Sequence, residues 1–490
     1  MKDNYLGPYK SFRDYLSALE HFNYIEHVDM IDQDAYEATA LVYKIMDNRK
    51  VYEAPALFFD QIQSKGKQFK HSLVGNLYGK WDFESIALGI MPVKGSPQQS
   101  YKNALEKLDN HISHNDKWEA IEPIEIKASK APCKEIKILG DDINLHNFPF
   151  IQTNPADGGC YINMGNVILK DKDLGRNIGT YRCQIKNSKK ISLNPQVNQD
   201  GWRFLMNMKE RGEKTADVAI VLGTDPITFS LSGSKVAQYG EDELGIAGGI
   251  IGEAIEVVKC ENNDILVPAN VEMVIEGTIP LDKMEEEGPF GEMYGYIGEK
   301  KEENFYMDVL AITHREKPIF SNQFTGITRG CLTAPIEAAL NRKYKKQFES
   351  FMGLHYPLEI PGFCFVNLES SSFDESMSIG SEISKSLKIA KITVLLDSEV
   401  DIHNLHDVLH AIGSRWQPFS SSEIIEKANA LSGDPSSTER GKGSRIVINA
   451  MKNSNQIQTN LEFAKTNREC LEAEFPDVFD QINTKFKDLI

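Results

Sequence analysis

Residues 267–299 read VPANVEMVIEGTIPLDKMEEEGPFGEMYGYIGE, and the prediction of the fold starts from this stretch. Residues 271–277 combine alternation with β-branched side chains, a pattern that predicts a β-strand. Gly288, Pro289 and Gly291 exclude a helix further on, because proline lacks a donor N–H and glycine is conformationally loose. We therefore predict a strand, followed by a turn that leads into a second, short strand.

Two carboxylates, Glu287 and Glu292, stand on opposite sides of the predicted turn and could point into one cavity. A plain acidic turn in water is the alternative. It is the favoured one on this stretch alone, because Glu285 and Glu286 lie next to it and turns usually face solvent. The rest of the chain has to decide between the two.

Composition limits the classes of function. The chain has 490 residues, which predicts two to four domains, and 41% hydrophobic residues, enough for a large core. With 54 Lys and Arg against 71 Asp and Glu, the net charge is −17, which disfavours binding to nucleic acid or to anionic membranes. The N-terminus lacks the apolar core of a signal peptide, and no apolar run approaches the roughly 18 residues of a membrane span. Seven scattered cysteines without a CxxC pair are typical of a reduced, cytoplasmic protein without disulfides or a cysteine-bound zinc ion.

Outward from the opening stretch, the chain divides into three regions that differ in their pattern of predicted helices and strands. Residues 1–120 alternate helix-like and strand-like pieces and predict an N-terminal α/β region. Residues 121–318 are β-rich, with frequent glycine and proline turns, and predict the central domain. Residues 351–490 return to alternating strands and helices and predict a C-terminal α/β domain. The predicted fold class is therefore a multidomain α/β and α+β protein.

Residues 319–350 contain the predicted connector between the last two domains. Thr333 is a plausible N-cap, Pro335 falls in the first turn, and a helical period follows. At the end of the chain, residues 460–486 are amphipathic, and we expect them to form terminal helices that dock on a neighbour.

Several familiar chemistries are disfavoured. No histidine lies between His146 and His314, so a Ser-His-Asp or Cys-His site in the β-rich domain would need a histidine from elsewhere. The glycine run at 245–253 follows a polar segment, whereas a dinucleotide-binding loop follows an apolar strand. We therefore reject a dinucleotide site there.

His403, His406 and His410 stand at helical spacing and could form a metal-binding face. No Asp or Glu cluster completes the set at ligand spacing. We favour an ordinary helix face in contact with solvent or a partner.

A set of polar groups in the β-rich domain points to a metal. Asn177 and Arg182 are five residues apart, and this odd separation places them on opposite faces of a strand unless Gly179 bends it. Taken singly, each polar residue here is more often a surface group. Taken together, Asn177, Asp200 and Glu243 would supply three hard oxygen ligands, which suit Mg²⁺ or Mn²⁺.

Arg182 offers a forked donor whose natural partner is a carboxylate. Together with two glutamates it suggests that an anionic substrate binds and that a proton moves. Decarboxylation fits this outline, but the carbanion that remains needs an electron sink that no side chain provides. A phosphate-bearing cofactor held by a metal would serve both needs.

These residues carry a resemblance to a known family. The chain resembles the UbiD-like decarboxylases, which use prenylated flavin mononucleotide (prenylated FMN). The resemblance covers nearly the whole chain. It is carried by SLVGNLYGKWDFESIALG (72–89), NIGTYR (177–182), DELGIAGG (242–249), VPANVEMVIEGTIPLDKMEEEGPFGEMYGY (267–296) and KITVLLDSEVDI (391–402).

The resemblance implies a central split β-barrel of the flavin-reductase-like type that binds the cofactor, and a C-terminal α/β domain that forms a homodimer or a higher homo-oligomer. It implies Arg182, Glu287 and Glu292 as catalytic residues, with Glu292 as the proton donor. The metal ligands that it implies are Asn177, Asp200 and Glu243. The full set that it implies for cofactor binding is Asn177, Ile178, Gly179, Thr180, Tyr181, Arg182, Gln199, Asp200, Glu243 and Lys391. It also implies a potassium ion, near which Arg415 would lie.

One departure from the family pattern affects the metal site. Many relatives have a Gln-His pair about eighteen residues after the arginine, with the histidine bound to the metal. Here Gln199 and Asp200 stand at that place. An aspartate keeps the site competent for a hard cation, and makes it all-oxygen with one more negative charge.

The expected function is the reversible, non-oxidative decarboxylation of an aromatic or α,β-unsaturated carboxylic acid, with prenylated FMN, Mn²⁺ or Mg²⁺, and a flavin prenyltransferase that supplies the cofactor. A flavin-dependent reductase and a non-catalytic carrier of modified flavin are the alternatives. We expect residues 321–335 to line the pocket mouth, where Arg329 either meets a polar group of the substrate or is an ordinary surface residue.

Overall fold

The computed structural model describes residues 7–485, apart from residues 50, 114, 198, 238–239, 370, 432, 438 and 453–466. Residues 1–6, on which part of the N-terminal prediction rests, lie outside the described residues, as does the start of the stretch predicted to form terminal helices.

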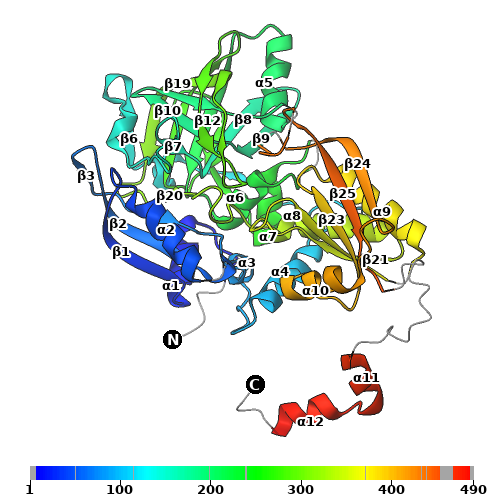
Figure 1. Cartoon of the computed structure of the whole chain (residues 1–490). Coiled ribbons are helices and arrows are strands. Elements are labelled where there is room, and N and C mark those ends of the chain that lie inside the picture. Colours follow the sequence, from blue (N-terminus) through cyan, green and yellow to red (C-terminus); the bar gives the residue numbers. More distant parts are fainter. Residues whose placement is uncertain are drawn as a thin grey trace.

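The N-terminal part forms a five-stranded sheet covered by helices (Figure 1). Its strands are β1 (Ile25–Asp32), β2 (Ala56–Ser64), β3 (Lys67–Phe69), β4 (Leu73–Gly75) and β20 (Phe320–Asn322). Its helices are α1 (Phe12–His21), α2 (Glu37–Asn48), α3 (Asp82–Ala87) and α4 (Pro97–Asp109). Strand β20 pairs with β4, although more than 200 residues separate the two in the sequence. This sheet therefore also fixes the position of the segment that precedes the connector helix.

A ten-stranded antiparallel sheet dominates the central part, as the β-rich texture predicts. Its strands are β6 (Ile136–Leu139), β7 (Tyr161–Ile162), β8 (Gly165–Asp171), β9 (Gly175–Thr180), β10 (Cys183–Asn187), β11 (Lys190–Leu193), β12 (Thr215–Leu222), β15 (Met273–Pro280), β16 (Glu285–Glu287) and β19 (Lys301–His314). The strand predicted at 271–277 is β15, and it lies in the middle of this sheet.

The order of the strands, β7-β10-β11-β19-β15-β12-β8-β9, has a direct consequence for the site. Strands β9 and β10 lie toward opposite ends of the sheet, yet only Tyr181 and Arg182 connect them. The three Cα–Cα steps from Thr180 to Cys183 reach at most about 11 Å, so the sheet must curl until its ends approach each other. Among the described residues the hydrogen-bonded path stays open, and no closed barrel is present.

Smaller elements decorate the central sheet. They are the helices α5 (Asp200–Glu210), α6 (Pro226–Gly233) and α7 (Glu243–Ile251), the sheet of β5 (Ile124–Glu125), β13 (Glu256–Lys259) and β14 (Leu266–Pro268), and the hairpin of β17 (Phe290–Gly291) and β18 (Ile297–Gly298). Short 3₁₀ turns lie at Val51–Glu53, Ala128–Lys130, Pro132–Lys134, Gly140–Asp142 and Leu145–Asn147. The glycine run predicted not to be a dinucleotide loop forms the buried helix α7, which Asp242 caps at its N-terminus.

The connector helix is α8 (Ala334–Gln347), with Thr333 at the N-cap position and Pro335 in the first turn, as predicted. One apolar cluster runs from the N-terminal helices through α6 and α7 to the start of α8. The connector is therefore packed into the body of the protein and is not a free linker.

The C-terminal part is a five-stranded sheet in the order β21-β22-β23-β25-β24. Its elements are β21 (Phe351–His355), β22 (Phe363–Leu368), α9 (Phe373–Ser386), β23 (Ile392–Asp397), α10 (Leu405–Arg415), β24 (Ser422–Asn429) and β25 (Lys442–Asn449). Apolar clusters cover both faces: Leu395 packs on one side of β23, and Val394 and Leu396 pack on the other. Burial on both faces explains the continuous apolar run of this strand.

The last described residues form two short helices, α11 (Asn467–Glu474) and α12 (Val478–Lys485), within the stretch 460–486 that was predicted to be helical. Pro476 lies between them, and proline cannot continue a helix. Figure 1 shows both helices away from the three sheets.

Candidate active site

The bend after β16 separates the two glutamates of the opening stretch. Glu287 ends β16, which pairs with β19, and Glu292 directly follows β17, whose partner in the hairpin is β18. The prediction of a turn that leads into a short strand is confirmed.

Arg182 brings the two glutamates together. Its Nε and Nη2 donate to Glu287 Oε1 and Oε2 at 3.0 and 2.8 Å, and its Nη1 donates to Glu292. The guanidinium also stacks on Phe290, 5.1 Å from the ring centre. Glu287 has no exposed surface, so the alternative of a solvated acidic turn is wrong.

The charge of Arg182 is secured by these contacts. Burial acts to lower the pKa of Arg182, but the hydrogen bonds and charge of Glu287, together with the charge of Glu292, outweigh it and raise the pKa. Arg182 therefore keeps its positive charge. A ligand carboxylate that binds Arg182 would share this cation with the carboxylates of Glu287 and Glu292.

Two further residues hold Glu287. The Tyr161 hydroxyl donates to Glu287 Oε1 at 3.2 Å, and the Asn304 amide donates to Oε2 at 3.5 Å. Burial and the nearby Glu287 raise the pKa of Tyr161, which therefore stays a neutral donor. Sequence reasoning missed both residues, because they come from β7 and β19 and no local pattern marks them.

Lys301 is another residue that sequence reasoning missed. It lies opposite Glu287 in the pairing of β16 with β19, and its ammonium contacts Asn194. Burial and the neighbouring charge of Arg182 lower the pKa of Lys301 to about 8. The site therefore contains a second cation whose charge is lost just above neutral pH.

The chain is not in a strand at Tyr181 and Arg182, between β9 and β10. Strand β9 ends at Thr180 and β10 begins at Cys183. A Cβ atom on Gly179 would lie 2.3 Å from Tyr181 Oη, so only glycine lets the tyrosine ring fold back there. The strand break removes the alternation that would have placed Asn177 and Arg182 on opposite faces.

The structure brings Asn177 and Glu243 together. Asn177 Nδ2 donates to Glu243 Oε1 at 3.4 Å, and the Ile178 backbone N–H donates to Oε2 at 3.3 Å. Asn177 Oδ1 is buried and has no hydrogen-bond partner among the described residues. A buried, unpaired oxygen next to a buried carboxylate is the donor set that a hard cation would complete.

Asp200 adds negative charge beside this pair. Burial, together with the charges of Asp242 and Asp200, raises the pKa of Glu243 to about 7. Asp200 opens α5 and lies 3.6 Å from Arg203, with 30% of its side chain exposed. Asn177 and Glu243 therefore offer oxygen donors that suit a divalent ion, which would replace the proton on Glu243, and Asp200 adds a negative charge nearby.

Thr180 and Gln199, two other residues predicted to bind the cofactor, make different hydrogen bonds. The Thr180 hydroxyl lies 2.8 Å from that of Ser232 and accepts from Asn166 Nδ2 at 3.2 Å. The Gln199 side chain instead turns to its own loop, where Oε1 accepts from the Gln196 backbone N–H at 2.6 Å.

The C-terminal sheet contributes Lys391. Its ammonium donates to Asp434 and Ser436, both at 2.7 Å, and lies 5.7 Å from the Tyr294 ring centre. In the same loop, a Cβ atom on Gly433 would lie 3.2 Å from Glu292 Oε2. Two parts of the chain more than 100 residues apart thus meet beside Glu292.

A small hollow of about 30 Å³, room for little more than one water molecule, lies against the β17–β18 hairpin. Phe290 and Tyr296 line it, as do Thr325 and Ile327 of the segment expected to line a pocket mouth. Arg329 does not reach it.

The expectation for Arg329 is wrong in both of its forms. The side chain is 2% exposed, so it is neither a surface residue nor open to a substrate. Its Nη1 donates to Glu84 Oε1 at 2.9 Å, and Nε lies 3.3 Å from Glu359. Sequence alone hides this, because the partners come from α3 and from the loop after β21.

The prediction of an ordinary helix face in contact with solvent holds for His406 and His410, which are exposed on α10. His403 differs, because it lies before the helix with 8% of its side chain exposed. Arg415, at the end of α10, pairs with Asp397 at 2.7 Å and with Glu399 at 3.0 Å.

Comparison with known proteins identifies the family. The profile described as the 3-octaprenyl-4-hydroxybenzoate carboxy-lyase Rift-related domain (UbiD) matches residues 124–328. The profile for the C-terminal domain of that carboxy-lyase matches residues 332–450.

Curated relatives include two proteins named phenolic acid decarboxylase. The one from Sedimentibacter hydroxybenzoicus is 28% identical over 414 residues, which is 81% of this chain and 82% of the relative. The one from Bacillus subtilis (strain 168) is 25% identical over 462 residues, 90% and 92% of the two chains.

Solved structures share the fold. The vanillic acid decarboxylase of Sedimentibacter hydroxybenzoicus in its open form has a TM-score of 0.80 and 23% identity, covering 97% of this chain and all of its own. The UbiD-class enzyme HmfF from Pelotomaculum thermopropionicum, in complex with FMN, has a TM-score of 0.79 and 24% identity, covering 98% and 100%. Within the described residues, no helix is long and apolar enough to cross a membrane. The two matching profiles together span most of the chain, and on this basis the chain belongs to the UbiD family and is an enzyme, a carboxy-lyase of the decarboxylase type.

Proposed function

We propose that this enzyme catalyses the reversible, non-oxidative decarboxylation of an aromatic or α,β-unsaturated carboxylic acid, with prenylated FMN and a divalent metal ion. The observation that carries the proposal is the pair of glutamates held by one arginine, Arg182. This reaction needs at least a cation that binds the substrate carboxylate and, next to it, a carboxylic acid that can return a proton.

The cofactor site is argued from the donor set. Asn177, Asp200 and Glu243 would hold Mn²⁺ or Mg²⁺, and the ion would bind the phosphate of the flavin. Lys391 would contact the cofactor from the C-terminal side. When bound, the prenylated flavin supplies the electron sink that the side chains lack.

The two glutamates have different surroundings and hence different proposed roles. Glu287 is fully buried and bound by both oxygens, so it positions Arg182. The Glu292 side chain is 28% exposed and contacts Arg182 through Oε1. Glu292 Oε2 is therefore the atom that we propose returns a proton to the carbon from which CO₂ has left.

The substrate carboxylate would face Arg182, and Lys301 would add to the positive potential. Together the two cations attract an anion into a chain with a net charge of −17.

Lys301 predicts a pH dependence. Its pKa of about 8 means that it is charged below pH 8 and neutral above. We expect the KM for an anionic substrate to rise about five- to tenfold as the pH passes through 8, which corresponds to about 1–1.4 kcal/mol of lost attraction. Steady-state kinetics between pH 6.5 and 9.5 measure this rise.

A matched pair of variants isolates the effect. Lys301→Met should have the high KM at every pH, whereas Lys300→Met, whose exposed side chain pairs with Glu286, should keep the wild-type profile. A pH profile of Lys301→Met that still rises near pH 8 would assign the titration to another group.

The function itself is tested by co-expression with a flavin prenyltransferase, followed by a screen of aromatic and α,β-unsaturated acids. Release of CO₂, or exchange of deuterium at the carbon that loses it, is expected only after co-expression. Hydride transfer from NAD(P)H in place of CO₂ release would favour the flavin-dependent reductase. A bound cofactor without turnover of any acid would favour the carrier.

The remaining expectations stand as parts of this proposal. We propose three units at residues 1–120, 121–318 and 351–490 joined by the connector at 319–350, a split-barrel role for the curled central sheet, and a homodimer formed by the C-terminal unit. A cytoplasmic location is supported by the seven free cysteines. A potassium ion near Arg415 remains a prediction.

A further inference from the structure

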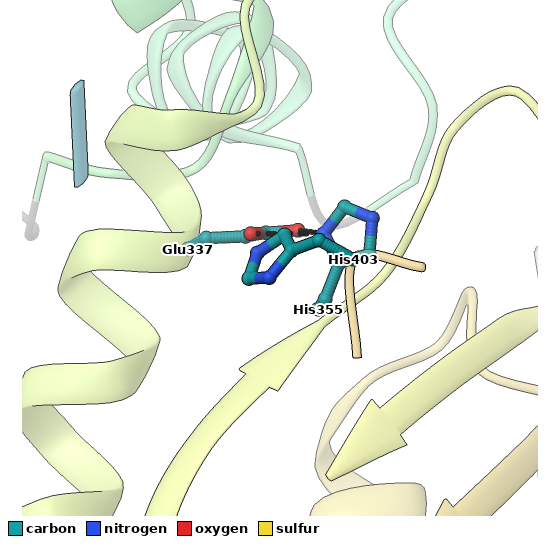
Figure 2. A group of neighbouring side chains, drawn as sticks. All are labelled: Glu337, His355 and His403. Atoms are coloured by element: carbon teal, nitrogen blue, oxygen red, sulfur yellow. Dashed lines mark hydrogen bonds and ion pairs between the residues drawn. The ribbon is translucent and has the colours of Figure 1, made fainter. Parts of the chain in front are cut away.

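Three side chains from separate elements converge at the junction of the N-terminal and C-terminal parts. Glu337 projects from α8, His355 ends β21, and His403 lies in the turn before α10 (Figure 2). One ligand atom from each lies within 4.8 Å of the others.

All three side chains are buried. Glu337 has no exposed surface and His355 is 2% exposed. The His403 side chain is 8% exposed. Glu337 is partly satisfied, because it accepts from the Tyr356 backbone N–H at 2.9 Å and contacts His355 Nδ1 at 2.9 Å.

His403 is the member without a hydrogen bond. Neither of its ring nitrogens makes a hydrogen bond among the described residues. Nδ1 lies 3.5 Å from Asp401 Oδ1, but without the geometry of a hydrogen bond. A buried imidazole with two unpaired nitrogens is unfavourable, and such a group calls for an explanation.

We propose that Glu337, His355 and His403 bind one divalent transition-metal ion of the zinc type. Two imidazoles and one carboxylate are a donor set that zinc and its neighbours prefer, whereas magnesium and manganese prefer oxygen. Asp401 behind the His403 ring resembles the carboxylate that commonly orients a metal-bound histidine. This site is separate from the all-oxygen group at Asn177 and Glu243.

The position of the cluster indicates a structural role. The ring of Trp81 lies 5.6 Å from that of His355, and the ring of Tyr101 lies 5.4 Å from that of His403. Lys102, next to Tyr101, pairs with Asp401 at 3.1 Å. An ion here would fix the start of the C-terminal sheet against the connector helix α8, beside the aromatic rings of Trp81 and Tyr101 from the N-terminal part.

The test uses the full chain, stripped of metal with a chelator, in a Glu243→Ala background so that the all-oxygen group cannot contribute. Zn²⁺ and Co²⁺ are the probes, added alone. We expect one tightly bound zinc per chain by elemental analysis, a visible absorption spectrum of four- or five-coordinate Co²⁺, and a higher midpoint of thermal unfolding with zinc.

Matched variants locate the ion. His403→Gln should weaken zinc binding at least about 10- to 100-fold, the loss that even outer-shell partners of a metal produce. It should also abolish the thermal shift. His406→Gln, three residues further on and exposed, should behave like its parent. His355→Gln repeats the test if His403→Gln does not fold.

Two results would overturn the proposal. One is a parent protein that binds no zinc and shows no thermal shift. The other is equal zinc binding by His403→Gln and its parent, or a loss in His406→Gln instead, which would place the ion on the surface of α10.

Discussion

Replacing Glu292 by glutamine is expected to lower turnover about 10³- to 10⁴-fold, within the range that general acid–base groups contribute, while the cofactor stays bound. Glutamine keeps the size of the side chain and an oxygen that can accept from Arg182 Nη1. It cannot supply or take up a proton. The measurement is single-turnover CO₂ release, with the flavin absorbance as the readout for cofactor content.

The control for this prediction is Glu286→Gln. Glu286 lies in the same turn, but it is exposed and pairs with Lys300, so its substitution should leave turnover within about twofold of wild type. Near-normal turnover of Glu292→Gln would remove Glu292 from the mechanism. A loss of flavin together with turnover would instead give it a structural role.

The second large effect concerns Glu243. Glu243→Ala is expected to abolish the binding of both the divalent ion and the prenylated flavin, and therefore all turnover. The substitution removes the carboxylate that touches Asn177 Nδ2 and the Ile178 backbone N–H. Because the ion is proposed to anchor the phosphate, the two ligands should be lost together. Elemental analysis and the flavin spectrum of purified protein measure this.

Asn177→Ala should weaken both ligands in the same way, since its buried Oδ1 is the proposed third donor. Glu253→Gln is the matched control: it lies just beyond α7, is exposed and pairs with Lys10. Wild-type amounts of metal and flavin in Glu243→Ala would refute the assignment of the metal site. Loss of flavin with full retention of the metal would show that the two sites are independent.

Local patterns decided the elements of this fold. The alternation at 271–277 marked the central strand β15, and the glycines and proline after it marked the bend at β16 and β17. Periodicity was reliable here because it reports on neighbours two or four residues apart within one element. Near the end of the chain, where helix was predicted over 460–486, Pro476 separates α11 from α12.

The candidate site was partly within reach of the sequence. The resemblance named Arg182, Glu287 and Glu292, but the composition of the turn alone favoured solvent exposure for the glutamates. Arg182 and Glu287 are 105 residues apart, and their contact depends on the position of β10 and β16 in the sheet. Tyr161, Asn304 and Lys301 join the site for the same reason, and no local signal could have named them.

The sequence by itself thus determined the element types, the family and the residue types of a cation-and-carboxylate site. Only the tertiary structure decided which charges are buried together. The sequence did not decide the surroundings of Arg329, and in the structure this residue pairs with Glu84 and Glu359. His403, which was expected on a helix, lies before α10 and close to Glu337 and His355. The physical reason is that burial and pairing are set by contacts between distant elements. Those contacts depend on the order of the strands in the sheets and on how the helices pack. The periodicity of one strand or helix carries no information about either.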